Sequence, residues 1–264
     1  MQFPAIAQSH AGPLKILLTS LVVAGVSSWP AIAHTDMQVE LTCPYDGTKF
    51  TAQLQGSGTS FATLLDFRPI GAIVTPWLLA ICPTNGFVFY KNKFEVGELE
   101  TLKPFVLSNE YQSMKDETPY FRAAWLMERA GFPHTKVTWE PHQATWETYE
   151  PRERYIRYAK AVLSRLPEDI EAAKGAEKTN LRILRGELLR RIEKFGEAAE
   201  ELRSLKDELD PASVEAKIVN YEIELSGHGD YKAHLSCEAM GGSEQIDKQC
   251  QNLGDAIKQV QEKR

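Results

Sequence analysis

The chain has 264 residues, of which 43% are apolar and 25% are charged, and its formal net charge is −6 at pH 7. This length and apolar content are sufficient for a buried core in one or two domains. The acidic balance argues against nucleic acid as a partner, because binding a polyphosphate requires a basic surface. The sequence contains no nucleophile elbow, phosphate loop, dinucleotide fingerprint or zinc-protease motif, so it predicts neither a reaction nor a cofactor.

The N-terminal segment is typical of a secretory signal. Lys15 precedes an apolar run at 16–26, and the triplet Ala-Ile-Ala at 31–33 fits a cleavage site. The run is shorter than the roughly 20 residues that cross a bilayer. We therefore expect residues 1–33 to be a signal peptide and the mature chain to begin at His34, with no membrane span after removal of the signal. The product should be periplasmic or secreted.

Residues 34–95 predict a small β module, because β-branched and aromatic residues surround two turn sequences. The turns read CPYDG at 43–47 and CPTNG at 82–86. Each resembles a Cys-Pro-x-Cys-Gly zinc knuckle in which Asp46 or Asn85 replaces the second cysteine. A third stretch, GSGTS at 56–60, predicts an exposed loop.

The two knuckle-like turns offer a poor ligand set for structural zinc. Two thiolates, a carboxylate and an amide depart from the Cys and His ligands of such sites, whereas the Asx-Gly pairs still favour the turns. Exported thiols tend to pair. We favour a disulfide between Cys43 and Cys82, with free buried thiols, or zinc on Cys43, Asp46 and Cys82, as alternatives.

Asp66 and Arg68 lie between the two turns. Their spacing places them on one face of a strand, where they could pair. We interpret them as a surface ion pair or a turn cap, with catalysis or ligand contact as the less favoured alternative.

Residues 96–264 predict a helical domain. Thr118, Pro119 and Gly131 bound a helix over 119–130, whose buried face should hold Phe121, Ala124 and Trp125, widened by Tyr120 and Met127. A second helix should follow Pro151 and extend to Leu166.

Residues 179–210 carry the clearest repeat signal. Gly186 and Ala198 have the separation at which the two helices of a tetratricopeptide unit touch. A further helix is expected over 211–225, and another from Tyr231 onward. The charged run at 187–208 predicts a solvated face with i,i+4 pairs.

Aromatic residues cluster in VTWEPHQATWETYEP at 137–151, which we interpret as a long connection between helices. Trp139, His142 and Trp146 could stack on a sugar or a peptide, although such residues more often fix a loop to the core.

The remaining cysteines, Cys237 and Cys250, flank a turn at Gly241-Gly242. We expect a disulfide across a helical hairpin, with two small core residues as the alternative. His234 would share a helical face with Cys237, in an ordinary structural position.

Several segments resemble a family of bacterial proteins catalogued as domain of unknown function twenty-two twenty-five. In that family the knuckles usually carry both cysteines, and the resemblance implies no particular reaction. It spans about residues 40–210. The matching pieces are Cys43-Pro44, Lys49-Phe50, Leu65 to Pro69, Ile81-Cys82-Pro83, Gly86-Phe87, Phe94, Thr118 to Phe121, Ala123-Ala124-Trp125 and Gly186 to Arg191.

Taken together, the sequence predicts a mainly α protein with tetratricopeptide-like helical hairpins and a small N-terminal β module resembling a degenerate zinc ribbon. The expected function is that of an exported, non-enzymatic scaffold or adaptor that binds a protein or peptide partner. A metal-binding or redox module at Cys43 and Cys82, and an envelope glycan-binding protein or enzyme, are the alternatives.

Overall fold

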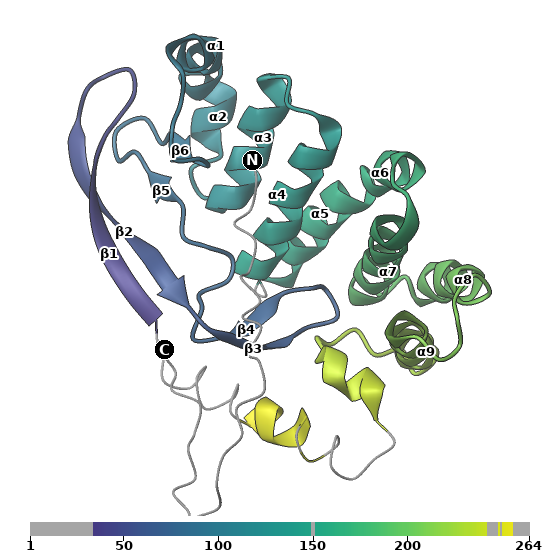
Figure 1. Ribbon diagram of the computed structural model, residues 1–264. Coiled ribbons are helices and arrows are strands. Elements are labelled where there is room, and N and C mark those ends of the chain that lie inside the picture. The colour runs from purple at the N-terminus through teal and green to yellow at the C-terminus, as the bar shows by residue number, and fades with distance from the viewer. Residues whose placement is uncertain (1–33, 149–150, 242–247, 249, 256–264) are drawn as a thin grey trace, which may run out of the picture. The chain divides into compact units, whose positions relative to one another are not determined.

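The computed structural model describes residues 34–148, 151–241, 248 and 250–255 (Figure 1). The predicted signal peptide at 1–33 lies outside them. The described part is mostly helical, with small antiparallel sheets toward its N-terminal end, as expected. The strands are β1 (His34–Thr42), β2 (Lys49–Gly58), β3 (Ser60–Thr63), β4 (Pro69–Gly71), β5 (Ala80–Ile81) and β6 (Val88–Phe89). The helices are α1 (Val96–Val106), α2 (Asn109–Ser113), α3 (Pro119–Arg129), α4 (His134–Glu147), α5 (Arg152–Leu163), α6 (Leu166–Ala172), α7 (Gly175–Arg191), α8 (Phe195–Lys206), α9 (Val214–Gly227) and the 3-10 helix η1 (Ser236–Met240).

The strands pair as three antiparallel two-stranded sheets, β1 with β2, β3 with β4, and β5 with β6. The predicted loop at 56–60 is wrong, because residues 56–58 complete β2 and Ser60 begins β3. The first residues of β1 pair with this stretch, with His34 opposite Gly58 and Thr35 opposite Ser57, and the register shifts after Thr35. The pairing overrides the local preference of glycine and serine for loops.

The β part shares a core with the first helices. Both knuckle cysteines are buried in this core, so the packing of α1 to α3 depends on where the two turns are held. Its buried members are Cys43, Cys82, Phe87, Leu102, Val106, Tyr111 and Leu126.

Helix α3 confirms the predicted helix to within one residue. Ala124 is buried as expected, but Arg122 and Leu126 are buried as well. The guanidinium of Arg122 donates to the carbonyl of Gly86, in the second knuckle. The sequence pattern predicted one buried face of α3, whereas packing against the β part buries a second face of this helix.

Residues 137–147 belong to helix α4, so the predicted connection is wrong. The rings at 139, 142 and 146 follow steps of three and four, which is the spacing of one helical face. Pro141 lies inside the helix, where it costs one backbone hydrogen bond without ending the helix.

Helices α7 and α8 form a hairpin, and α9 packs against α8. Glu193, with a φ of 67°, makes the turn between α7 and α8. Gly186 faces Leu202, and a methyl group added at Gly186 would lie 2.5 Å from a Leu202 methyl carbon. Glycine is therefore needed for the close approach of these two helices.

Replacing Gly186 by alanine should lower the free energy of unfolding by about 1 to 3 kcal/mol, because the buried Leu202 must move. Gly196→Ala is the matched control. A methyl group there meets nothing within 4 Å, and alanine should stabilise helix α8 by about 0.5 to 1 kcal/mol. Urea unfolding of both variants measures this, and equal effects would contradict the packing role of Gly186.

The C-terminal part departs from the prediction at two places. Helix α9 begins at Val214, not at 211, because Asp210 accepts from the Ala212 amide in a turn and Ser213 caps the helix. The chain from Tyr231 to His234 is not helical, because Leu235 forms a β-bridge with Leu64 before η1 begins.

Cys237 and Cys250 form a disulfide with a Cα–Cα distance of 5.8 Å. The bond joins η1 to the helical residues at 250–255. Residue 242 of the predicted Gly-Gly turn lies outside the described part of the chain. Among the described residues, no helix has the length and apolar character needed to span a bilayer.

Candidate functional site

A pocket of about 770 Å³ lies between helices α4, α6 and α7, with Phe67 from the β3–β4 turn at its edge. Leucine, alanine and aromatic side chains supply apolar surface, and threonine, asparagine and acidic side chains supply polar groups. A pocket of this size can hold one or two side chains of a partner. It is lined by Phe67, Thr135, Thr138, Trp139, Asp169, Ala172, Ala173, Glu177, Asn180, Leu181 and Leu184.

The turn between β3 and β4 brings Phe67 to the pocket. Phe67 has a φ of 64°, a left-handed conformation that is uncommon for a bulky residue. Asp66 stabilises the turn by accepting from the Arg68 amide at 3.1 Å. The Phe67 ring packs against apolar clusters on either side of α7, so the turn is fixed to the helices.

The polar groups of the pocket come from three helices. Asp169 is 4% exposed, and its Oδ1 lies 3.1 Å from Nδ1 of His134. Glu177 and Asn180 lie three residues apart in the first turns of α7, so they share a face. The lining residues include two carboxylates and no basic side chain.

Of the predicted aromatic contacts, only Trp139 lines the pocket. Its side chain is 36% exposed, whereas His142 is fully buried and Trp146 is 8% exposed. The His142 ring lies between the two indoles, with centroid distances of 4.9 Å to each. Burial lowers the pKa of His142 to about 3, so this ring is neutral and belongs to the core.

Asp66 and Arg68 lie in a turn rather than on one face of a strand. The expected turn cap is present, but Asp66 is 1% exposed, so the expectation of a surface pair is wrong. The Arg68 guanidinium donates to the hydroxyl and the carbonyl of Thr75. Burial raises the pKa of the Asp66 carboxyl, and the negative charge of Glu187 raises it further, whereas the positive charges of Arg191 and Arg68 lower it.

Part of the predicted solvated face is buried. Glu187 and Arg190 are fully buried and form an ion pair at 2.6 Å, and Arg191 is 4% exposed. Arg190 also donates to the carbonyls of Asp230 and Lys232, which ties the C-terminal segment to α7. Most charges of α8 are exposed as predicted, but Glu201 is only 14% exposed and pairs with Arg182 and Arg185 of α7.

Glu222 of α9 lies fully buried beside this ion pair. Burial raises its pKa, and the nearby Glu187 raises it further. Neither of its carboxylate oxygens has a hydrogen-bond partner among the described residues. Burial without a hydrogen-bond partner therefore favours the neutral form of the Glu222 carboxyl.

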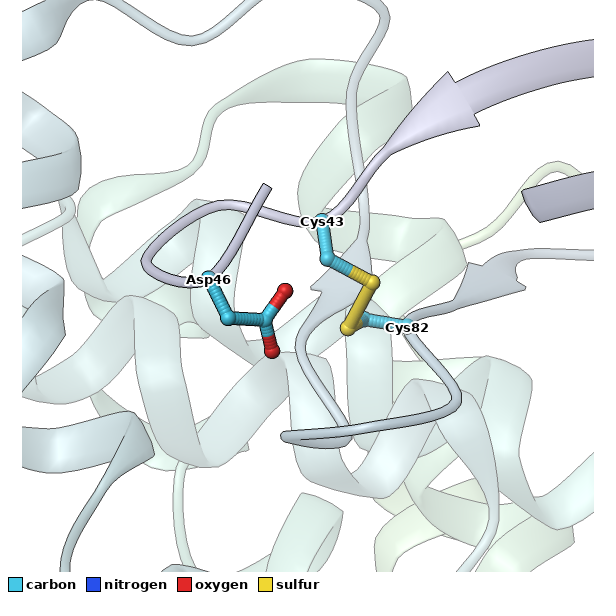
Figure 2. Close-up of side chains that lie close together, drawn as sticks. All are labelled: Cys43, Asp46 and Cys82. Atoms are coloured by element: carbon cyan, nitrogen blue, oxygen red, sulfur yellow. A yellow bond between two sulfur atoms is a disulfide. The ribbon is translucent and has the colours of Figure 1, made fainter. Parts of the chain in front are cut away.

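The two knuckles are joined covalently. Figure 2 shows the disulfide between Cys43 and Cys82 with the Asp46 carboxylate beside it, and the Cα–Cα distance is 5.4 Å. Asp46 accepts from the Thr84 hydroxyl, and this bond is the main reason that its pKa is lowered. Asn85 donates to the Pro44 carbonyl at 2.7 Å. The residues that replace the second cysteines therefore bond across to the opposite turn.

Among the described residues, Cys43, Asp46 and Cys82 are the one group of three whose potential ligand atoms lie within 4.8 Å of one another. Both sulfur atoms belong to the disulfide, and a cysteine sulfur is a good metal ligand only as a free thiolate. The residues in this state do not fit a zinc ion. They fit a covalent link that holds the two turns together.

Two carboxyl groups of α4 form a further electrostatic feature that the sequence did not predict. Burial raises the pKa of Glu140 and of Glu147 to about 7, and the charge of Glu147 contributes to the shift of Glu140. Glu147 accepts from the amide of Tyr120 at 3.3 Å. They lie seven residues apart, which is two turns of one face, and this spacing was the available signal.

These shifts predict a loss of stability as the pH rises. The unfolded carboxyls ionise near their ordinary pKa, whereas the folded ones keep their protons until about pH 7, so folding is favoured at low pH. Glutamine cannot ionise, so Glu140→Gln and Glu147→Gln should each avoid this loss. The free energy of unfolding of each variant minus that of wild type should be roughly 2 kcal/mol larger at pH 8 than at pH 5. Urea unfolding at pH 5 and pH 8 tests this prediction. A stability difference between variant and wild type that is the same at both pH values would contradict it.

The pocket itself was mostly missed, because its residues come from segments far apart in the sequence. Trp139 was the only lining residue that the sequence analysis selected. Comparison of the chain with protein-family models, curated proteins and solved structures gave no match.

Proposed function

We propose that the chain is an exported, non-enzymatic adaptor that holds a segment of a protein or peptide partner in the pocket between α4, α6 and α7. The observation that carries the proposal is the pocket itself, which combines apolar side chains with polar groups and a half-exposed Trp139. Binding sites of this kind use apolar contacts for affinity and a few polar groups for orientation.

The helical architecture supports this proposal. Successive helices pack side by side in the pairs α3–α4, α4–α5, α7–α8 and α8–α9. Stacked helical hairpins present extended surfaces to partners, and we propose a tetratricopeptide-like arrangement for α7 and α8 on the basis of Gly186. Membership of the family that the sequence resembles also stays a proposal.

The cysteines support an exported protein. Two disulfides indicate an oxidising environment outside the cytoplasm. A periplasmic or secreted location, reached through removal of residues 1–33, is part of the proposal. N-terminal sequencing of the exported product tests it, since the mature chain should begin at His34.

The binding function can be tested by selecting peptides from a displayed random library with the mature protein. Ala172 lines the pocket and is exposed, so Ala172→Trp should fill the pocket without disturbing the core. We expect selected peptides to bind wild type and to lose at least tenfold in affinity for Ala172→Trp, because interface energy is concentrated in a few central contacts.

The matched control is Ala212→Trp, which places the same side chain in an exposed turn away from the pocket lining. This variant should bind the selected peptides as wild type does. Selection of no peptide, or equal binding to both tryptophan variants, would refute the proposed function.

A further inference from the structure

We infer that the pocket takes a lysine or arginine side chain of the partner segment, placed next to an apolar side chain. This inference rests on the proposed peptide binding and names the chemistry of the occupant. The pocket lining carries two carboxylates and no basic group, within a chain of net charge −6. A cationic side chain therefore complements it, whereas a phosphate or an acidic segment would be repelled.

Asp169 is the deeper of the two acids. It lies in the first turn of α6 and is almost fully buried, so its charge acts in a medium of low dielectric constant. The His134 ring lies 3.1 Å from Asp169 through Nδ1 and 3.7 Å from Glu168 through Nε2. One histidine thus lies between two carboxyl groups, so acidic side chains outnumber it here.

Glu177 and Asn180 form the outer polar edge. Both side chains are exposed on α7, so they remain free to meet a bound group. The amide oxygen of Asn180 and the carboxylate of Glu177 can accept from an ammonium or guanidinium group, which has donors only. Asp169 and Glu177 come from different helices, so together they act on the occupant from two directions.

The aromatic groups suit the stem and the charge of such a side chain. The indole of Trp139 lines the pocket and is partly exposed, and a cation over an indole is attracted by the ring quadrupole. Leu181, Leu184 and Phe67 supply apolar surface for the methylene groups of a lysine or arginine stem, and for a neighbouring apolar residue.

The test is a nitrogen-15 NMR titration of the mature protein with three acetylated, amidated tripeptides. The probes are Leu-Lys-Leu, Leu-norleucine-Leu and Leu-Glu-Leu, and the indole signal of Trp139 reports binding. We expect the lysine peptide to bind about tenfold more tightly than the norleucine peptide, as one charge-assisted hydrogen bond would give. The glutamate peptide should bind most weakly.

Asp169→Asn and Glu177→Gln should each reduce the preference for lysine over norleucine by several-fold, and both changes keep the shape of the side chain. Glu171→Gln is the control, because it removes the same charge from an exposed position of α6 outside the pocket lining. It should leave the preference unchanged.

Equal affinity for the lysine and norleucine peptides, or no movement of the Trp139 signal with any of the three, would overturn the inference. The inference would also be overturned if library-selected peptides that contain no basic residue bind at the pocket. In that last case the proposed peptide binding would stand, so the two failures can be distinguished.

Discussion

Replacing Glu187 by alanine should lower the free energy of unfolding by about 3 to 5 kcal/mol, because the change removes the buried carboxylate that pairs most closely with the buried Arg190 guanidinium. Glu187 is fully buried and accepts two hydrogen bonds from the Arg190 guanidinium, at 2.6 and 3.0 Å. The Nη1 atom of Arg191 lies 3.6 Å from the other carboxylate oxygen. Urea unfolding of the mature protein measures the loss.

The control for Glu187→Ala is Glu200→Ala, which removes an exposed acid from the neighbouring helix α8. The control should change stability by no more than about 0.5 kcal/mol. Glu187→Gln, which keeps one acceptor, should lie between the two. If Glu187→Ala unfolds with the same free energy as Glu200→Ala, the buried pair does not support the fold.

Removing the Cys43–Cys82 disulfide by replacing both residues with serine should cost about 4 kcal/mol on the chain-entropy model, because the bond closes a 39-residue separation. The Cys237–Cys250 bond spans 13 residues and should contribute about 3 kcal/mol. The first loss should also loosen α1 to α3, since both knuckle cysteines lie in the core that these helices share.

The two serine pairs serve as controls for each other. Proteolysis of the folded proteins should speed up near the knuckles for the first pair and near the C-terminal residues for the second. A Cys43→Ser, Cys82→Ser protein as stable as wild type would mean that the hydrogen bonds of Asp46 and Asn85 suffice to hold the turns together.

The fold was predictable where a local pattern coincides with its tertiary environment. The end residues and the apolar spacing predicted the bounds of α3 to within one residue. The expected oxidising compartment and the two Asx-Gly turns favoured the disulfide between Cys43 and Cys82. Prediction failed where residues distant in the sequence determine the local structure. Residues 56–58 became strand because β1 pairs with them, and residues 231–234 are not helical because Leu64 pairs with Leu235.

The candidate site was less predictable than the fold. Trp139 could be selected as an aromatic residue of interest, but nothing local shows that His142, three residues later, points into the core. The charges of α7 illustrate the same limit. Glu187 and Arg190 have the spacing of a solvated pair, and only the packing of α9 and the C-terminal segment shows that they are buried.

The central claim is that a partner segment occupies the pocket between α4, α6 and α7. The most direct measurement is a map of backbone and indole chemical-shift changes across the mature protein during titration with a library-selected peptide. We predict that the largest changes fall on residues that line the pocket, with Trp139, Asp169 and Asn180 among them. Changes centred on the β1–β2 hairpin or the knuckles, with the pocket signals unmoved at saturation, would contradict the account.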